Sequence, residues 1–376
     1  MSIHRFSFPT NIHFGPGARK LVGGHLRDLG LRRPLIVTDR GLAALPVLSE
    51  FIQHLAGDLE VAVYSGVHGN PTASQVKEGV AAFNSHEADC VIGFGGGAAL
   101  DVAKVVAAMA VHSGDVIEYA WDHPRVRPLD QPLPPFFALP TTSGTGSEVG
   151  RSSVVSEDDT HVKRVIFSPK LLALAVFADP ELTLGLPPAV TAATGIDALT
   201  HNIESYLSPA YHPLCDGIAL EGVRIAARAL PVAVREGRNL QARTDMMMAS
   251  MMGAIAFQKD LGAVHSCAHA LGAICDLHHG LANALMLEPV MRFNAEAVPD
   301  KIAELEHAAG LASGDFVPWL ARLKREIGIG SSLAAAGVQR EQFPQLVDLA
   351  VKDVCHQTNP RKVTAADFER FFEQAY

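Results

Sequence analysis

The sequence predicts a two-domain protein in which an α/β domain with a parallel sheet precedes an all-helical domain. In the first half, short apolar segments rich in β-branched residues alternate with amphipathic helical segments, as strands and crossover helices do in a parallel sheet. From about Pro187 onward, helical segments rich in Ala, Leu and Met follow one another with few strand signals. A length of 376 residues suffices for two domains that each bury a core.

Four segments of the first half are predicted strands: 34–39 (PLIVTD), 59–65 (LEVAVYS), 88–97 (ADCVIGFGGG) and 135–142 (PFFALPTT). Helical stretches such as ASQVKEGVAAFNSHE and ALDVAKVVAAMAVHS lie between them. The prolines of LPPAV suit the first turn of a helix. We place the boundary in the segment DPELTLGLPP, which predicts an α/β domain of residues 1–183 and a helical domain of residues 184–376.

Composition excludes several classes of partner. A net charge of −9 argues against nucleic acid, which calls for a basic patch. We find no uncharged apolar run of membrane-spanning length, and the first residues lack the basic flank and apolar core of a signal peptide. Five cysteines without a close CxxC pair predict reduced thiols and a cytoplasmic protein. The five methionines of DMMMASMMGAIAF predict helix packing in the core, not a copper site.

Two glycine-containing loops suggest a nucleotide site. GFGGGAALDVAK (93–104) places glycines between a predicted strand and a helix, where free backbone N–H groups attract phosphate, although it is not the GxGxxG fingerprint. PTTSGTGSEV (140–149) supplies many hydroxyl groups directly after a strand, which favours a ligand loop over a solvated turn. Asp39 ends the first predicted strand and suits a ribose diol, which favours NAD over NADP, although strands often end in Asp without such a role.

The second half carries acids and histidines at helical spacing. Asp197 and His201 stand four residues apart in GIDALTHNIESYLS, which places both on one face of a helix. His265 and His269 have the same spacing, and His279 follows beside a glycine. For Asp197 and His201 alone, an ordinary acid–histidine surface pair is the simpler alternative. One carboxylate with several imidazoles suits a divalent transition metal such as Fe²⁺ or Zn²⁺, and the two pairs on separate helices together favour the metal. Spacing alone leaves open which histidines are ligands.

Five blocks of the sequence resemble the iron-containing (group III) alcohol dehydrogenase family over nearly the whole length: GGGAALDVAK, PTTSGTGSEV, DPELTLGLPPAVTAATGIDALTHNIE, GAVHSCAHALGAICDLHHGLANA and TNPR. The resemblance implies a Rossmann-like first domain and an all-helical second domain, the plan shared with dehydroquinate synthase. It implies that the metal ligands are Asp197, His201, His265 and His279. His269 is then a nearby catalytic residue that relays a proton.

The resemblance also implies a cofactor site, and the sequence departs from the family pattern at two positions. The predicted cofactor-binding residues are Asp39, Asn70, Gly96, Gly97, Ala98, Asp101, Thr141, Thr142, Thr145 and Lys163. The family's usual serine after the three glycines is Ala98 here, which removes one hydroxyl but keeps the backbone N–H. Its usual proline before the HG motif is His278, which either turns toward the metal or faces solvent; we favour solvent.

The predicted activity is reversible hydride transfer between a primary alcohol and NAD⁺, with Fe²⁺, or alternatively Zn²⁺, as the metal. If Lys259 or Arg151 faces the site, the substrate carries a carboxylate, as 4-hydroxybutyrate does; otherwise both are solvated surface charges. Two other functions remain alternatives: a lyase of the dehydroquinate synthase type, and a non-catalytic NAD-binding protein. The family suggests a homo-oligomer, a dimer or larger.

Overall fold

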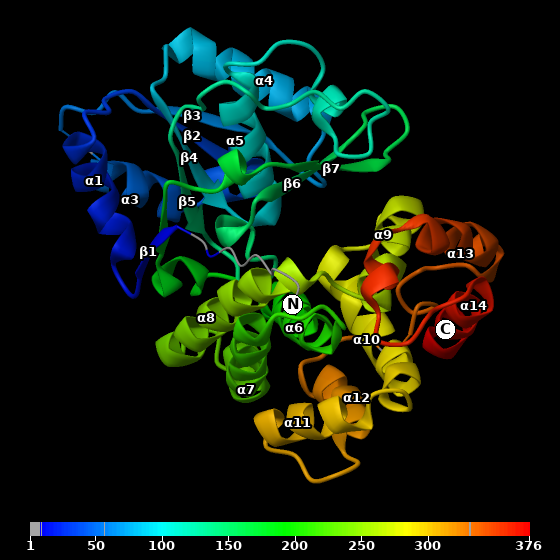
Figure 1. Cartoon of the computed structure of the whole chain (residues 1–376). Helices are drawn as coiled ribbons and strands as arrows, with labels where there is room; N and C mark the ends of the chain where they lie inside the picture. Colours follow the sequence, from blue (N-terminus) through cyan, green and yellow to red (C-terminus); the bar gives the residue numbers. More distant parts are fainter. Residues whose placement is uncertain (1–7, 9, 56, 331) are drawn as a thin grey trace. The chain divides into compact units, whose positions relative to one another are not determined.

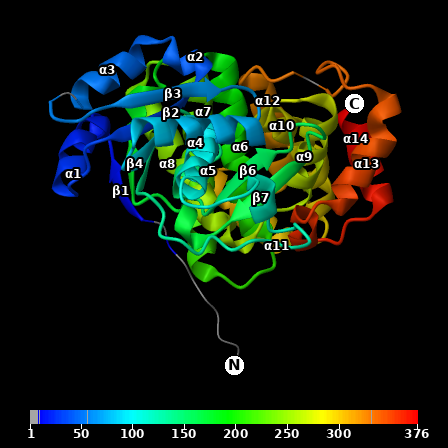
Figure 2. The same ribbon diagram turned by 90° about the horizontal axis from the view of Figure 1, so that it is seen from above.

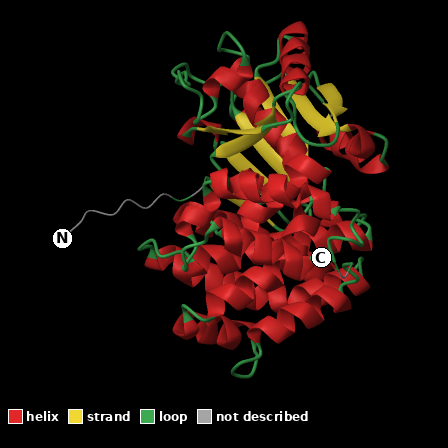
Figure 3. Ribbon diagram, turned by 90° about the vertical axis from the view of Figure 1, so that its right-hand side faces the viewer, coloured by secondary structure: helices red, strands yellow, loops and turns green. Residues whose placement is uncertain are grey.

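The computed structural model describes residues 8, 10–55, 57–330 and 332–376. The chain forms two compact units (Figure 1), of which one contains residues 10–142 and 146–183. The other contains residues 8, 143–145 and 184–376. The strands of the described chain all belong to the first unit, and the second is built from helices (Figure 3). The predicted fold class, an α/β unit with a parallel sheet and an all-helical unit, is confirmed.

The sheet of the α/β unit has six strands in the order β1-β8-β5-β4-β2-β3, and every neighbouring pair is parallel. The strands are β1 (Asn11–Phe14), β2 (Pro34–Asp39), β3 (Ala62–Val67), β4 (Cys90–Gly95), β5 (Phe136–Pro140) and β8 (Ala175–Ala178). From β2 the chain adds β3 on one side and then β4 on the other. Ligands of open α/β sheets bind beyond the carboxyl ends of the strands at such a reversal.

Helices cover both faces of this sheet because its strands are apolar on both faces. On one face, α1 (Val22–Asp28) and α3 (Pro46–Leu55) pack against the strands, and the ring of Phe51 stacks on Phe94 of β4 at 4.9 Å. On the other face, α5 (Gly97–Met109) lies so close to β4 that a Cβ at Gly93 would come within 3.1 Å of Ala103. Helix α4 (Ala73–His86) packs beside α5, as Figure 2 also shows.

Three predicted strands, 34–39, 88–97 and 135–142, correspond to β2, β4 and β5. The segment predicted at 59–65 also forms a strand, but β3 begins at Ala62. Strands β1 and β8 were not predicted, nor was the antiparallel hairpin of β6 (Ser152–Ser156) and β7 (Lys163–Phe167). Strands β1 and β8 have four residues each, too few for a periodic pattern, and their pairing comes from the sheet.

The helical unit contains α6 (Pro188–Leu207), α7 (Pro213–Arg235), α8 (Leu240–Ala256), α9 (Ala263–Cys275), α10 (His279–Ala295), α11 (Pro299–Ala309), α12 (Phe316–Glu326), α13 (Phe343–Lys352) and α14 (Ala365–Ala375). Helix α6 begins at a proline, as predicted. Met246, Met247 and Met251 of α8 are buried, which confirms that this segment packs in the core. Among the described residues, no helix combines the length and apolar character needed to span a membrane.

Candidate functional site

The four predicted ligand side chains come together in the helical unit. Asp197 and His201 lie on one face of α6, His265 lies on α9, and His279 is the first residue of α10. One ligand atom from each side chain lies within 4.8 Å of the other three. Three of these side chains are buried, and His279 is partly exposed.

The distances fit a single cation. Asp197 Oδ1 lies 3.9 Å from His201 Nε2, 4.0 Å from His265 Nε2 and 3.5 Å from His279 Nε2. In a tetrahedral site with bonds of about 2.1 Å, two ligand atoms are about 3.4 Å apart, so small side-chain movements bring all four into bonding range. One carboxylate and three imidazoles form a donor set suited to Fe²⁺ or Zn²⁺.

The charge states of the group favour metal binding. Burial alone would raise the pKa of Asp197, but the neighbouring histidines and a hydrogen bond from Asn283 hold this pKa below its ordinary value. Burial, together with the nearby His201, lowers the pKa of His265 well below its ordinary value. The carboxylate is therefore ionised and the His265 imidazole is neutral at pH 7, and these are the forms that bind a metal.

Glu204, which was not predicted from the sequence, orients His265. Its Oε2 lies 2.6 Å from His265 Nδ1, and the side chain also accepts the backbone N–H of Val264 at 2.8 Å. Burial raises the pKa of Glu204 to about 7, whereas the backbone donors at the start of α9 act in the opposite direction. A carboxylate beside Nδ1 places the proton there and leaves the lone pair of Nε2 directed toward Asp197.

Asn283 is a second site residue that was not predicted from the sequence. Its Nδ2 donates to Asp197 Oδ1 at 2.7 Å and lies 3.4 Å from His265 Nε2 and 3.3 Å from His279 Nε2. Its Oδ1 is buried and has no hydrogen-bond partner among the described residues. The position four residues after His279 on α10 was the available signal, because that spacing places both side chains on one helix face.

Two glycines allow the close backbone contacts that place the ligands. A Cβ at Gly280 would lie 2.1 Å from the carbonyl oxygen of Ala193, so only glycine lets α10 approach α6 at His279. A Cβ at Gly262 would lie 2.6 Å from Glu204 Oε1, so glycine also lets α9 start against this carboxylate. These two close contacts explain why glycine stands at positions 262 and 280 of the sequence motifs.

The TNPR segment supports the start of α9. Asn359 Oδ1 accepts the backbone N–H of Ala263 at 3.3 Å, and Thr358 Oγ1 donates to the carbonyl of Leu261 at 2.8 Å. Asn359 in turn exchanges hydrogen bonds with the side chain of Asn294. Asn359 thus pairs one of the backbone donors that the buried start of α9 leaves without a partner in the helix, and the other contacts hold Thr358 and Asn359 in place.

The remaining two histidines of this region lie outside the group of four. The ring of His269 stacks on the ring of His279 with centroids 5.5 Å apart, and its Nδ1 is bound by Asp353. His278 precedes α10 and is exposed, in accordance with the orientation toward solvent that we favoured.

Several predicted cofactor residues meet where the strand order reverses. Asp39 ends β2, where its Oδ1 accepts the backbone N–H of Leu42 at 2.8 Å, and its Oδ2 lies near Gly95 at the end of β4. Gly96 caps α5 and lies against Thr142, which follows β5. The first N–H groups of α5, including those of Gly97 and Ala98, have no partner within the helix and point beyond this edge.

The other predicted cofactor residues are distributed differently. Asn70 follows β3, and Lys163 of β7 pairs with Ser156, whose backbone N–H bonds to the carbonyl of Pro71. Thr141 is buried after β5, and Asp101 accepts hydrogen bonds from Ser147 Oγ at 2.6 Å and from the backbone of Val154 at 2.9 Å. Thr145 belongs to the short segment 143–145 that packs with the helical unit.

Glu148 lies next to these residues, and it is expected to make the free energy of unfolding depend on pH. Burial raises its pKa to about 7 from the ordinary 4.5, although Lys104 opposes the shift. Between these values the native state holds a proton that the unfolded chain has lost, so the free energy of unfolding falls as pH rises through this window, by about 3 kcal/mol. We expect Glu148→Gln to remove this fall, as measured by urea unfolding at pH 5 and pH 8. The exposed Glu50→Gln serves as control, and equal pH dependence of wild type and Glu148→Gln would contradict the assignment.

The position of Lys259 differs from both possibilities that the sequence left open. It is neither directed at the histidines nor solvated: its side chain is buried, and its Nζ pairs with the Asp216 carboxylate and donates to the carbonyl of Tyr206 at 3.3 Å. Nearness to His265 in sequence was misleading because the chain turns at Asp260 between them. Arg151 is partly buried, with its guanidinium 5.5 Å from the centre of the Phe167 ring.

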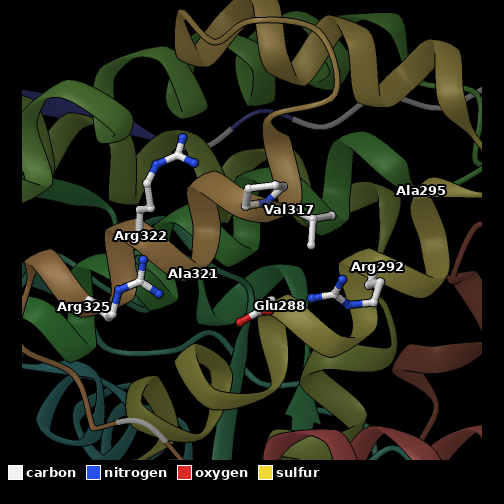
Figure 4. Close-up of a pocket in the computed structure, with 8 residues that line it drawn as sticks. Glu288, Arg292, Ala295, Val317, Ala321, Arg322 and Arg325 are labelled. Carbon is white, nitrogen blue, oxygen red and sulfur yellow. Dashed lines mark hydrogen bonds and ion pairs between the residues drawn. The ribbon is translucent and has the colours of Figure 1, made fainter.

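A groove between α10 and α12 is separate from this site (Figure 4). It is lined by Glu288, Arg292, Ala295, Val317, Pro318, Ala321, Arg322 and Arg325. Its α10 residues begin nine positions after His279, which is about 13 Å along a helix. Arg292 pairs with Glu288 at 2.8 Å and Arg322 with Asp315 at 2.5 Å, so two of its three arginines are already neutralised.

Comparison with known proteins agrees with this geometry. Residues 9–180 match the family model "Iron-containing alcohol dehydrogenase", and residues 191–376 match "Fe-containing alcohol dehydrogenase family, C-terminal". The 4-hydroxybutyrate dehydrogenase of Cupriavidus necator is 40% identical, covering 97% of this chain and 98% of that protein. A crystal structure of a 1,3-propanediol oxidoreductase is similar with a TM-score of 0.94 at 38% identity, with full coverage of both chains.

A third similar structure was solved with a nucleotide. The sulfoacetaldehyde reductase of Bifidobacterium kashiwanohense, in complex with NAD⁺, has a TM-score of 0.91 at 27% identity and covers all of this chain and 99% of that one. The predictions of the family and of an NAD-linked alcohol dehydrogenase are confirmed. The chain belongs to the iron-containing alcohol dehydrogenase family.

Proposed function

We propose that Asp197, His201, His265 and His279 hold one Fe²⁺ ion and that the protein oxidises a primary alcohol or hydroxy acid with NAD⁺, reversibly. The single observation that carries the metal assignment is the convergence of these four ligand atoms within 4.8 Å. Zn²⁺ is the alternative metal, because the same donor set suits both ions. The bound cation supplies a Lewis acid that stabilises negative charge on the substrate oxygen.

The protein residues around the metal have distinct roles in this proposal. Asn283 holds the Asp197 carboxylate through a hydrogen bond of 2.7 Å, and Glu204 holds the His265 ring through one of 2.6 Å. Both contacts fix ligand orientation before the cation binds, which lowers the entropy cost of assembling the site. His269 is the proposed catalytic residue that moves the substrate proton, because its ring stacks on His279 and is partly exposed.

We propose that NAD binds at the carboxyl edge of the sheet, with the pyrophosphate at the start of α5. Gly96, Gly97 and Ala98 offer backbone N–H groups there, and Thr141 and Thr142 flank them. Asp39 stands at the end of the adjacent β2, where its carboxylate suits a ribose diol and repels a 2′-phosphate. Asn70, Asp101, Thr145 and Lys163 complete the proposed surroundings of the cofactor.

The substrate class is the open part of this proposal. Similarity to a 4-hydroxybutyrate dehydrogenase supports a hydroxy acid, and similarity to a 1,3-propanediol oxidoreductase supports an uncharged alcohol. Of the two cations considered for a substrate carboxylate, the buried Lys259 is already paired, which leaves Arg151 as the candidate. We also propose a cytoplasmic homodimer, to be tested by light scattering of the purified protein.

The variant Lys259→Ala distinguishes a structural role of Lys259 from a role in binding a substrate carboxylate. Removing the ammonium leaves the partly exposed Asp216 without its partner, so we expect a loss of about 2–4 kcal/mol in the free energy of unfolding. Residual activity should fall equally with 1-butanol and 4-hydroxybutyrate. Urea unfolding and steady-state kinetics measure both effects, with the exposed Lys352→Ala as control. A selective loss with 4-hydroxybutyrate would return Lys259 to the substrate site.

The experiment that tests the function is NADH formation over a panel of alcohols and hydroxy acids. The protein is stripped with a chelator and reconstituted anaerobically with Fe²⁺ or Zn²⁺. We expect turnover to return with metal and to produce NADH in proportion to the aldehyde formed. Net NADH formation excludes a lyase that regenerates its cofactor in each turnover. NAD binding without turnover under every condition would contradict the proposal and favour a non-catalytic protein.

A further inference from the structure

His269 occupies a position between the proposed metal ligands and solvent. It lies one turn after His265 on α9, and its ring is nearly parallel to that of His279, with centroids 5.5 Å apart. Its side chain is 34% exposed, whereas that of His265 is 1% exposed. Within the described part of the chain, its Nε2 has no hydrogen-bond partner, and Nδ1 is the nitrogen that is held.

Asp353 is the residue that holds this Nδ1. It follows directly after α13 and lies 84 positions from His269 in the sequence. Its Oδ2 is 2.8 Å from His269 Nδ1, and its Oδ1 accepts hydrogen bonds from Ser266 Oγ at 2.7 Å and from the backbone N–H of Cys355 at 2.8 Å. Both carboxylate oxygens are therefore bound by donors that belong to fixed elements.

The charge of Asp353 agrees with this arrangement. Burial alone would raise the pKa of its carboxyl group, but the hydrogen bonds from His269, from Ser266 and from the backbone of Cys355 hold this pKa well below its ordinary value. An ionised carboxylate only accepts hydrogen bonds, so the proton of the pair lies on His269 Nδ1. In the neutral imidazole, this leaves a lone pair on Nε2.

The same three side chains, His269, Asp353 and Cys355, are close enough to be considered as a second metal site. Two features argue against it. The 2.8 Å between His269 Nδ1 and Asp353 Oδ2 is a hydrogen-bond length and is shorter than the roughly 3.4 Å between two ligands of a tetrahedral cation. Burial also raises the pKa of the Cys355 thiol well above its ordinary value, so the thiol stays protonated.

We propose that Asp353 is the positioning residue of His269: it accepts the Nδ1 proton and so keeps Nε2 free to take a proton from the substrate hydroxyl. With NAD⁺ bound as the hydride acceptor, His269 Nε2 would take the hydroxyl proton of the alcohol, and the imidazolium would then give this proton to water. Asp353 stabilises the imidazolium in between. The inference rests on the proposed dehydrogenase function and extends it to a residue outside the metal group.

The test is Asp353→Asn in the metal-loaded enzyme. The variant keeps the shape, but its amide group can donate to Nδ1 and so favour the other tautomer of His269. We expect kcat to fall by between about 10- and 1,000-fold, within the range of general acid–base catalysis, while KM for alcohol changes less than about threefold. Metal content and NADH binding should stay at wild-type levels. Asp348→Asn, on the exposed side of α13, is the matched control.

A double-mutant cycle distinguishes positioning from a structural role. If Asp353 acts through His269, adding Asp353→Asn to His269→Ala should change kcat by less than about threefold. An equal fall of kcat in both backgrounds, or an unchanged kcat in the single variant, would overturn the proposal. If Asp353→Asn does not fold, Ser266→Ala replaces it, because it removes one anchor of the carboxylate; a smaller fall in kcat that also vanishes without His269 is then expected, and an unchanged kcat overturns the proposal.

A spectroscopic readout is independent of turnover. In protein labelled with nitrogen-15 histidine, the His269 signal, assigned with His269→Ala, should show the proton on Nδ1. In Asp353→Asn the proton should move to Nε2. A proton already on Nε2 in the wild type would overturn the proposal whether or not the enzyme is active, whereas absence of turnover in the wild type would reject only the dehydrogenase function.

Discussion

Asp197→Asn is expected to lower metal affinity by more than about 100-fold, because loss of an outer partner of a ligand already costs 10- to 100-fold and Asp197 is a proposed ligand itself. The carboxylate supplies the only negative charge among the four ligands, and three imidazoles alone bind a divalent cation less strongly. Activity should fall with metal occupancy, to less than about a thousandth of wild type. Metal content after dialysis, measured by mass spectrometry, and NADH formation check both expectations.

The fold should survive this substitution, since asparagine has the same shape and Asn283 can still contact it. Asp300→Asn, on the exposed first turn of α11, is the control and should retain metal and activity. Wild-type metal content in Asp197→Asn would show that the cation is held elsewhere.

Glu204→Gln is expected to lower metal affinity by about 10- to 100-fold, although the substitution replaces none of the four proposed ligands. The glutamine amide would donate toward His265 Nδ1, so the imidazole would have to carry its proton on Nε2, where the lone pair for the metal is needed. Its carbonyl oxygen can still accept the backbone N–H of Val264, so unfolding free energy should change little. Competition with a metal-binding dye gives the affinity, and urea unfolding gives the stability.

The variant Glu204→Ala has a second effect, which distinguishes the orientation of the His265 ring from the stability of the start of α9. It leaves backbone donors at the start of α9 unpaired in the interior. We expect this to lower the free energy of unfolding by a further amount of about 2–4 kcal/mol. Glu221→Gln, at a partly exposed position of α7, is the control for loss of a charge. Unchanged metal affinity in Glu204→Gln would mean that the His265 tautomer is set by another group.

Local sequence signals predicted much of this molecule. Apolar, β-branched runs predicted β2, β4 and β5, and a proline pair predicted the start of α6. The i, i+4 spacing placed Asp197 and His201 on one helix face. The same rule would have found Glu204, three residues beyond His201 on that face, and Asn283, four residues beyond His279.

Other features have no local signal. Which histidines come together depends on how α6, α9 and α10 pack, and residues 197, 265 and 279 are far apart in the chain. Asp353 reaches His269 across 84 positions. Lys259 stands close to His265 in sequence, yet it is buried against Asp216, because proximity along the chain does not fix the direction of a side chain. Strands β1 and β8 exist through their pairing in the sheet.

The most direct test of the central claim is the position of the metal in crystals grown with Fe²⁺ or Zn²⁺, located by anomalous scattering at the absorption edge of each. We predict one peak within about 2.0–2.2 Å of an Asp197 carboxylate oxygen and one nitrogen of each of His201, His265 and His279. A peak bound instead by His269, Asp353 and Cys355, or no peak in the helical unit, would contradict the assignment.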